Sequence, residues 1–229
     1  MRVAIHQPNY APWCGYFAKM KICDVFVFLD DAQLPGGSYV NRAQIRNEAG
    51  ASWLTIPVRR RGPEPISAVE PAEPGWQAAH MRRLQNWYRR AAHYRTIMSL
   101  IEPVYATPSA RVAEFNMRLI RAVAGYLGIE PRFEISTDLH PEGAGDERNL
   151  SLVKILGGDT YVSGKGGENY QDPAKFEAAG IALEVRQYLP IPYQQFNGEF
   201  IPGMSILDAL FNLGPETGTV LEYSTPAAQ

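Results

Sequence analysis

The stretch DERNLSLVKILGGDTYVSGKGGENYQDPAKFEAAGIALEVRQY (146–188) alternates between helical and strand patterns, and this alternation decides the fold class. Its first part, 146–158, begins with acidic residues, carries apolar residues at helical spacing and ends in two glycines, which predicts a capped helix. The proline near the start of 172–180 predicts a second, short helix. Strands are expected at 132–136, 160–164 and 181–188. This β-α-β-α-β series predicts a parallel sheet with helical crossovers.

Two more strands are predicted near the N-terminus. The β-branched and aromatic runs at 3–5 and 24–29 are short, as buried strands are, and the segment 16–22 between them has helical spacing. A hairpin is expected from 40–45 and 52–58. The N-terminal part therefore adds a strand-helix-strand unit and a hairpin to the parallel sheet.

Helical periodicity dominates the middle of the chain. Prolines exclude a helix from the passage 59–76, RRRGPEPISAVEPAEPGW. Apolar residues then recur at intervals of three and four, and Gly128 follows the last helical segment as a C-cap. The three helices are expected at 76–92, 94–105 and 111–127.

The predicted fold class is α/β, with an open, mostly parallel, Rossmann-like sheet. The chain is expected to form a single domain over 1–229, with a helical insertion at about 76–128. A final helix at 204–214 is expected to pack back on the sheet. Ligands of such folds gather at the carboxyl ends of the strands.

Composition narrows the classes of partner. The chain has 229 residues, 45% of them hydrophobic and 20% charged, which is ordinary globular usage. With 22 basic and 24 acidic residues the net charge is -2, so neither nucleic acid nor an anionic membrane is an expected partner. The start MRVAI soon gives way to polar residues, and no apolar run approaches the length of a membrane span. We expect a soluble, cytoplasmic protein.

Polar side chains follow the first two predicted strands. HQPNYAPWCGYF (6–17) follows the first strand and DDAQ (30–33) follows the second, so both clusters are expected at one edge of the sheet. A histidine beside a carboxylate can act as a general base, because the carboxylate holds its tautomer and raises its pKa. The candidates are His6, Asp31 and Gln33 for catalysis, and Gln7, Asn9, Tyr10 and Trp13 for substrate binding.

Structural alternatives remain open for these clusters. One alternative is that the backbone satisfies His6 and that Asp30 and Asp31 form turns or cap a helix. Adjacent carboxylates also suit magnesium, although successive residues of an extended chain point in opposite directions, so Asp31 is favoured for the site and Asp30 for its support. For the aromatic residues the two alternatives are packing in the core and stacking on a sugar or a base.

Two further segments contribute candidates. Asn41 and Arg42 lie on an extended segment where an arginine could grip a carboxylate or phosphate, the alternative being a solvated edge strand. SGKGGENY (163–170) follows a predicted strand and carries Gly164 and Lys165. Such a loop lets backbone amides approach a phosphate, but the P-loop order is missing, so a plain turn is the alternative.

The two cysteines have neither the spacing nor the neighbours of a zinc site or a disulfide framework. Cys23 is expected to be a plain buried thiol. Cys14 lies inside the opening motif, where a thiol nucleophile would change the mechanism, so its reactivity needs a separate test. No metal ligand is predicted from either residue.

Several longer motifs recur along the chain from its first strand to its last helix: HQPNYAPWCGYF, DVFVFLDDAQ, NRAQI, WLTIPV, LGI, TYVSGKGGENYQD and GMSILDALFNLG. On these motifs the chain resembles the WbqC-like family. The resemblance implies a bacterial transferase that modifies amino groups in O-antigen, amino-sugar or natural-product assembly. It marks nine of the residues above: His6, Gln7, Asn9, Tyr10, Trp13, Asp31, Gln33, Asn41 and Arg42. At position 14 other residues are common in the family, which speaks against a cysteine nucleophile.

A second resemblance is confined to the fold. A strand, a histidine-containing loop and then Gly15 before a helix are similar to the nucleotidylyltransferase superfamily, whose signature ends in Gly-His. Here the pair is Gly15-Tyr16. The missing histidine should weaken adenylate chemistry, because that side chain stabilises the phosphate leaving group.

These observations give three hypotheses. The leading one is acyl or aminoacyl transfer to the amine of an amino sugar or similar metabolite, with His6 as base, Asp31 orienting it, and Gln33 with Asn9 binding the oxyanion or sugar hydroxyls. It needs no cofactor, and its partners are small molecules, with a carrier-bound acyl donor as one option. The alternatives are a nucleotidyltransferase that uses magnesium at Asp31 and Lys165 on the phosphates, and a non-catalytic subunit of a biosynthetic complex.

Overall fold

A five-stranded, all-parallel sheet forms the centre of the computed structural model, which describes residues 1–59, 62–169, 171–196 and 198–223. The spatial order is β7-β2-β1-β8-β9. Counted along the chain this is 3-2-1-4-5, the order of a doubly wound fold, so the predicted α/β Rossmann-like class is confirmed. The strands are β1 (Arg2–His6), β2 (Val25–Phe28), β7 (Arg132–Ile135), β8 (Thr160–Gly164) and β9 (Ala182–Arg186).

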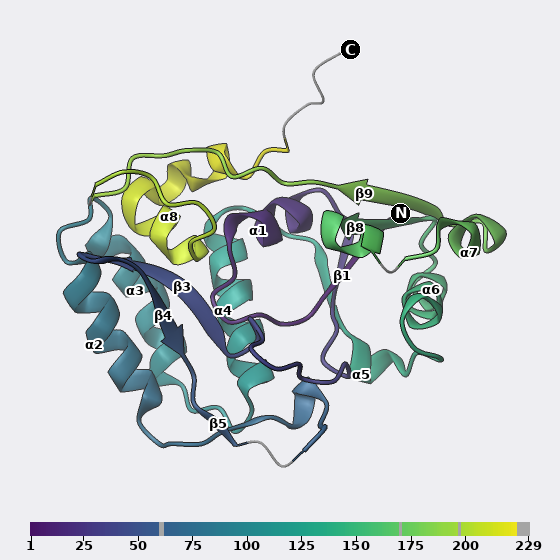
Figure 1. Cartoon of the computed structure of the whole chain (residues 1–229), viewed down its shortest axis with the longest axis horizontal. Helices are drawn as coiled ribbons and strands as arrows, with labels where there is room; N and C mark the ends of the chain where they lie inside the picture. Colours follow the sequence, from purple (N-terminus) through teal and green to yellow (C-terminus); the bar gives the residue numbers. More distant parts are fainter. Residues whose placement is uncertain (60–61, 170, 197, 224–229) are drawn as a thin grey trace.

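Helices cover both faces of this sheet. Figure 1 shows α1 and α4 on one side of the sheet and α6 and α7 on the other. The α-helices are α1 (Cys14–Lys21), α2 (Trp76–Tyr88), α3 (Tyr94–Ala106), α4 (Val112–Tyr126), α5 (Ser136–Leu139), α6 (Asp146–Ile155), α7 (Pro173–Ala178) and α8 (Ile206–Leu213). Three 3-10 helices complete the helical segments: η1 (Ile66–Ala68), η2 (Lys165–Asn169) and η3 (Gly214–Val220).

The strand β2 (VFVF) and the middle of β1 (VAI) are apolar at every position, because both faces of the sheet are buried there. Ala4 and Phe26 belong to the core that also includes residues of α1, α3, α4 and α8. Val3 and Ile5, which point the other way, pack with residues of α6 and α7. The alternation along β1 therefore fixes which face each layer of helices covers.

Antiparallel pairs lie beside the main sheet. The predicted hairpin is confirmed, with β3 (Arg42–Asn47) paired to β4 (Gly50–Thr55). The expected second strand is divided, because β4 ends at Thr55 and a short strand β5 (Val58–Arg59) then pairs with β6 (Glu70–Pro71). The proline-rich passage contains the 3-10 turn η1 but no α-helix among its described residues.

The three predicted middle helices are α2, α3 and α4, which lie between β6 and β7 in the chain. The first of them ends at Tyr88, four residues earlier than expected. The chain turns after Tyr88, and the backbone N–H of His93 donates to the carbonyl of Phe211 in α8 at 3.0 Å. A contact distant in sequence thus holds the turn after α2.

Helix α8 differs from the expectation that it packs back on the sheet. It packs mainly against α3, β3 and η3. The buried carboxylate of Asp208 explains this position, since it accepts hydrogen bonds from Tyr88 of α2 at 2.7 Å and from Tyr193 at 2.6 Å. Each helix in the described part of the chain is too short or too polar to cross a membrane.

Candidate functional site

A cavity of about 750 Å³ lies where the carboxyl ends of β1 and β8 meet. These two strands are neighbours in the sheet. The strands that follow them in the sheet lie on opposite sides, β2 and β7 beyond β1, and β9 beyond β8. Doubly wound proteins bind their ligands at this switch point. Its lining includes the predicted residues His6, Gln7, Trp13, Gly164 and Lys165.

The imidazole of His6 is held by its own backbone neighbour. Its Nδ1 lies 3.2 Å from the carbonyl oxygen of Gln7, which also accepts a hydrogen bond from the Tyr16 hydroxyl at 3.1 Å. A carbonyl oxygen only accepts, so Nδ1 carries the hydrogen and Nε2 keeps a lone pair when the ring is neutral. The Tyr16 ring packs against the imidazole with the centroids 4.6 Å apart.

Burial and a nearby cation keep this imidazole neutral. The pKa of His6 is lowered to about 3, first by burial and then by the charge of Lys19. The Lys19 ammonium group donates to the Ile5 carbonyl at 3.0 Å, and burial lowers its pKa to about 8. At neutral pH the cavity therefore contains an uncharged histidine and a charged lysine.

The loop after β8 forms another wall. Lys165 begins η2 and donates to the side-chain oxygen of Gln187 at 2.9 Å. A Cβ atom on Gly167 would lie 2.4 Å from side-chain oxygens of both Ser163 and Gln171, so only glycine fits there. The loop thus brings its backbone close to the cavity, as expected for the predicted glycine-rich segment, whose Tyr170 lies outside the described residues.

Aromatic residues form a third wall. Trp13 is 37% exposed, and its ring meets that of Tyr188 edge-on at 5.2 Å. The indole lies over Gly15, where a Cβ would come within 2.6 Å of it. Gly15 therefore makes room for Trp13, and Tyr16 at the next position is buried against His6.

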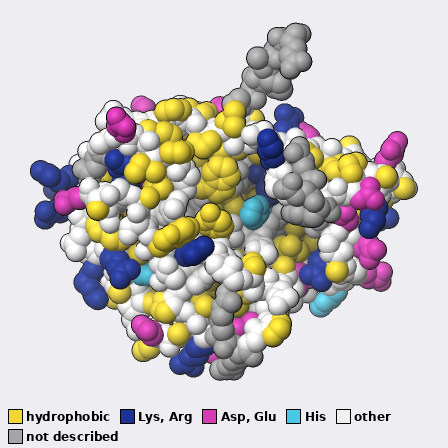
Figure 2. Space-filling view, viewed as in Figure 1, with side chains coloured by type: hydrophobic (Ala, Val, Ile, Leu, Met, Phe, Trp, Pro, Cys, Tyr) yellow, Lys and Arg dark blue, Asp and Glu magenta, His cyan; other side chains and the backbone are white. Residues whose placement is uncertain are grey.

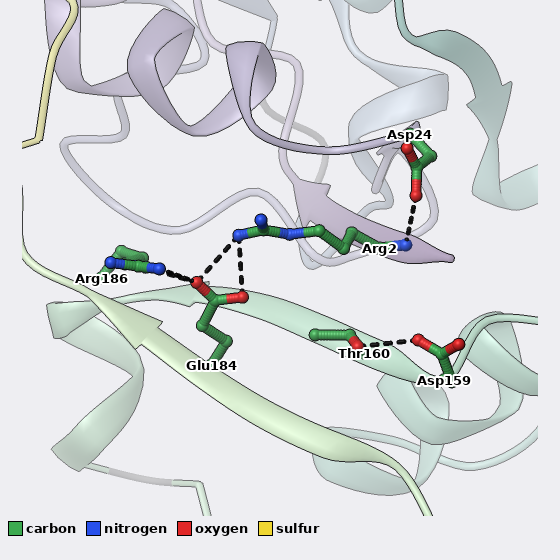
Figure 3. Close-up of polar contacts among 6 residues, drawn as sticks. All are labelled: Arg2, Asp24, Asp159, Thr160, Glu184 and Arg186. Atoms are coloured by element: carbon green, nitrogen blue, oxygen red, sulfur yellow. Dashed lines mark hydrogen bonds and ion pairs between the residues drawn. The ribbon is translucent and has the colours of Figure 1, made fainter.

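Cations outnumber anions around the cavity. Among its described lining residues are Lys19, Arg148, Lys165 and Arg186, and no aspartate or glutamate. Arg186 is paired behind the wall with Glu184, whose carboxylate also binds Arg2 at 2.8 Å (Figure 3). In Figure 2 a histidine reaches the surface near the middle of the face, with Lys or Arg side chains close by.

The two predicted polar clusters are neighbours, but they do not form a His–Asp pair. His6 is aligned with Phe28 across β1 and β2, and the Leu29 N–H donates to the His6 carbonyl at 2.9 Å. Asp31 is instead paired with Arg148 at 3.5 Å. The Asp30 carboxylate accepts from the backbone N–H and hydroxyl of Thr137, at 2.9 and 2.7 Å. The orienting role expected of Asp31 thus falls to the Gln7 carbonyl.

Other predicted residues lie outside the cavity lining. Tyr10 is fully buried, and its hydroxyl is hydrogen-bonded to His80 at 2.8 Å and to Tyr105 at 2.5 Å, so its role is structural rather than substrate binding. Gln33 is exposed and Asn9 is buried, both away from the lining. Neither residue lines this cavity, so the oxyanion or hydroxyl contacts expected of them stay a prediction.

Asn41 and Arg42 make contacts within the β3–β4 hairpin. The Asn41 amide donates to the Ile56 carbonyl at 3.0 Å, which ties the start of β3 to the end of β4. The Arg42 guanidinium stacks over the Trp53 ring, 4.2 Å from its centroid. Neither residue belongs to the cavity lining, so their expected contact with substrate is replaced by contacts within the hairpin.

The buried environment of Cys14 does not favour the thiolate that a nucleophile needs. Burial, helped by the negative charge of Asp208, raises the pKa of its thiol to about 12. Cys23 is a free thiol with its pKa raised to about 12, again mainly by burial. Both sulfur atoms therefore stay protonated at neutral pH.

Sequence reasoning missed Lys19, Arg148 and Tyr188. Lys19 follows Gly15 by four residues and so lies on the same face of α1, which was the available signal. Arg148 lies in the first turn of α6, and Tyr188 lies just beyond β9. No local pattern assigns these two residues to a site, because only the strand order brings them beside β1.

The magnesium alternative lacks a ligand set in the part of the chain that is described. No group of three or more His, Cys, Asp or Glu residues there could hold a metal ion. The carboxylate proposed for that role, Asp31, is already paired with Arg148.

Strand order and cavity together define a doubly wound α/β protein with a ligand site at its switch point. The model of the WbqC-like protein family matches residues 7–220, so the chain belongs to this family. It is 34% identical over 226 residues to a protein of Mycobacterium tuberculosis named "Uncharacterized protein Rv1507c", covering 97% of this chain and 98% of that protein. No solved structure matches.

Proposed function

We propose that the protein is a transferase that places an acyl or aminoacyl group on the amine of an amino sugar or related small metabolite. The observation that carries the proposal is the neutral His6 imidazole in the switch-point cavity, with Nδ1 bound to the Gln7 carbonyl. That arrangement leaves Nε2 as a proton acceptor. Acyl transfer to an amine needs such an acceptor, because the attacking nitrogen must lose a proton.

The reaction follows from this geometry. The substrate amine attacks the carbonyl carbon of the acyl donor, and a carbon–nitrogen bond forms. His6 takes the proton from the nitrogen at Nε2 and returns it to the leaving group as the bond between the carbonyl carbon and that group breaks. A thioester on a carrier is a suitable donor, since its thiol leaves readily and accepts this proton.

The surrounding residues position the substrate and adjust the base. Gln7 and the glycine-rich turn from Gly164 to Gly167 provide hydrogen-bonding groups at the cavity wall. The pKa of His6 is lowered first by burial and then by the charge of Lys19. A negative group bound beside Lys19 offsets that charge and raises the pKa of His6 toward the range of an effective base.

The experiment is a transfer assay with His6→Gln. Purified protein is incubated with amino sugars and with acyl donors attached to coenzyme A or to a carrier protein, and products are measured by mass spectrometry. We expect His6→Gln to lower kcat by about 10²–10⁴-fold, the usual contribution of a general base. His140→Asn, a change at an exposed histidine, is the matched control and retains activity. Undiminished turnover by His6→Gln refutes the assignment.

The cationic lining also favours a second candidate, nucleotidyl transfer to a phosphorylated metabolite. Lys165 and Arg148 could bind a triphosphate. The two candidates predict different products: an amide for acyl transfer, and pyrophosphate release for nucleotidyl transfer. An assay for pyrophosphate with nucleoside triphosphates and magnesium separates them, because release of pyrophosphate is expected only for the second candidate.

A further inference from the structure

Part of the positive charge that lines the cavity has no carboxylate partner. Arg148 and Arg186 have carboxylate partners behind the lining, Asp31 and Glu184. Lys19 and Lys165 instead donate to neutral oxygens. Within the described lining the positive charge of these two lysines is therefore not balanced by a carboxylate.

Lys19 is the most unusual of these cations. Only 6% of it is exposed, its hydrogen bond goes to the Ile5 carbonyl, and no carboxylate among the described residues forms an ion pair with it. A buried charge without a counter-ion is costly to the fold. A ligand that provides the opposite charge offsets this free-energy cost.

We propose that Lys19 is the fixed cation of a phosphate subsite at the end of β1, and that Lys19, Arg148 and Lys165 bind a phosphate or diphosphate group of the substrate. This inference rests on the proposed function, in that the group belongs to the metabolite whose amine faces His6. It adds a substrate class: a phosphorylated, amine-bearing small molecule. A bound phosphate would also provide the negative charge beside Lys19 that His6 needs to act as a base.

Two features favour a phosphate over a single carboxylate. The two lysines without a carboxylate partner, Lys19 from α1 and Lys165 from η2, carry more positive charge than one carboxylate requires. The glycine turn Gly164–Gly167 and the first turn of the ten-residue helix α6 also line the cavity. Backbone amides in glycine turns and at helix N-termini bind phosphates well.

The test is calorimetric titration of the full-length protein with pyrophosphate at pH 7. Lys19→Met keeps the buried stem and removes the charge, and we expect it to weaken pyrophosphate binding about tenfold or more, the effect of losing one charge-assisted hydrogen bond. Lys21→Met is the matched control, because Lys21 is on the same helix but exposed and paired with Glu222. This control should bind pyrophosphate as the unmodified protein does.

Lys165→Met is the second variant and keeps the test decisive if Lys19→Met does not fold. Lys165 is exposed at the cavity rim, and its loss should weaken pyrophosphate binding at least about threefold. The proposal is overturned if pyrophosphate does not bind at millimolar concentration, if both variants bind it normally, or if acetate binds equally well.

Further probes identify the source of the phosphate. Tighter binding of uridine diphosphate than of glucosamine 1-phosphate supports a nucleotide-linked substrate, and the reverse order supports a sugar phosphate. His6→Gln separates this proposal from the proposed function. The phosphate subsite predicts that His6→Gln still binds pyrophosphate, whereas the proposed function predicts that the same variant loses turnover.

Discussion

At the scale of single residues, some side chains of the motif after β1 line the cavity and others are buried in the core. His6 and Trp13 line the cavity, whereas Tyr10 points into the core and meets Tyr105 and His80. The sequence identified the motif as important but could not make this division. The partners of Tyr10 lie 70 and 95 residues further along the chain, so its environment depends on where α2 and α3 pack.

Thiol reactivity tests the exclusion of Cys14 from the chemistry. Because burial raises the pKa of both Cys14 and Cys23 to about 12, neither should react quickly with a thiol reagent in the folded protein at pH 8. Both should react after unfolding in guanidinium chloride, which is the internal control. We also expect Cys14→Ala to retain transfer activity. Fast labelling of Cys14 in the native protein would contradict this account.

At the scale of elements, the loop after β1 is fixed by a helix more than a hundred residues away. The fully buried amide of Asn116 in α4 donates to the carbonyls of Pro8 and Val40, at 2.8 and 2.7 Å. The prolines in this loop restrict its backbone further. A rigid loop of this kind holds His6 and Trp13 at the cavity.

Replacing Asn116 by alanine tests this support. The change leaves two buried carbonyls without their donor, and each such loss costs about 1–3 kcal/mol, so the free energy of unfolding should fall by about 2–6 kcal/mol. Gln77→Ala removes a similar amide-to-carbonyl bond at an exposed site and should change it by less than about 0.5 kcal/mol. Urea unfolding measures both. Equal effects of the two variants would show that the loop is held by other contacts.

Most elements could be predicted because their signals are local. The helix and strand patterns of 146–188 correspond to α6, β8, α7 and β9. The predictions were wrong where contacts between residues distant in sequence determine where a helix ends or packs. The turn that ends α2 is bound to the Phe211 carbonyl, and the position of α8 depends on the hydroxyls that Asp208 binds.

At the scale of the whole molecule, strand order assembles the site. β1 and β2 lie side by side, which is the condition for the two polar clusters to be neighbours. The cavity, however, lies between β1 and β8, which are separated by more than 150 residues. No periodicity in the chain specifies that pairing, so Asp31 and Gln33 were expected at the site and Lys19 and Arg148 were not.

Acid stability provides a test at this scale. The pKa of His6 is lowered to about 3 and that of His80 to about 4, so the unfolded chain binds these protons near pH 6.5 and the folded protein does not. The stabilisation present above pH 6.5 is therefore lost as the pH falls toward 3–4, by at most about 1.4 kcal/mol per pH unit for each histidine.

Denaturant unfolding between pH 6.5 and 4.5 measures this dependence. His6→Gln should reduce the slope of unfolding free energy against pH by about 1 kcal/mol per pH unit, because one of the two buried histidines no longer titrates. His140→Asn should leave the slope unchanged, since that side chain is exposed. An unchanged slope in His6→Gln would mean that His6 is protonated normally in the folded protein.

The central claim is that ligands bind where β1 meets β8, and NMR titration of nitrogen-15-labelled protein tests it most directly. The probe is glucosamine 1-phosphate, which carries both an amine and a phosphate. We predict that the backbone amide shifts change at 5–7, around Lys19, and in 145–149 and 163–167. Changes concentrated instead at 30–33 and 41–42, with those four regions unaffected, would contradict the account.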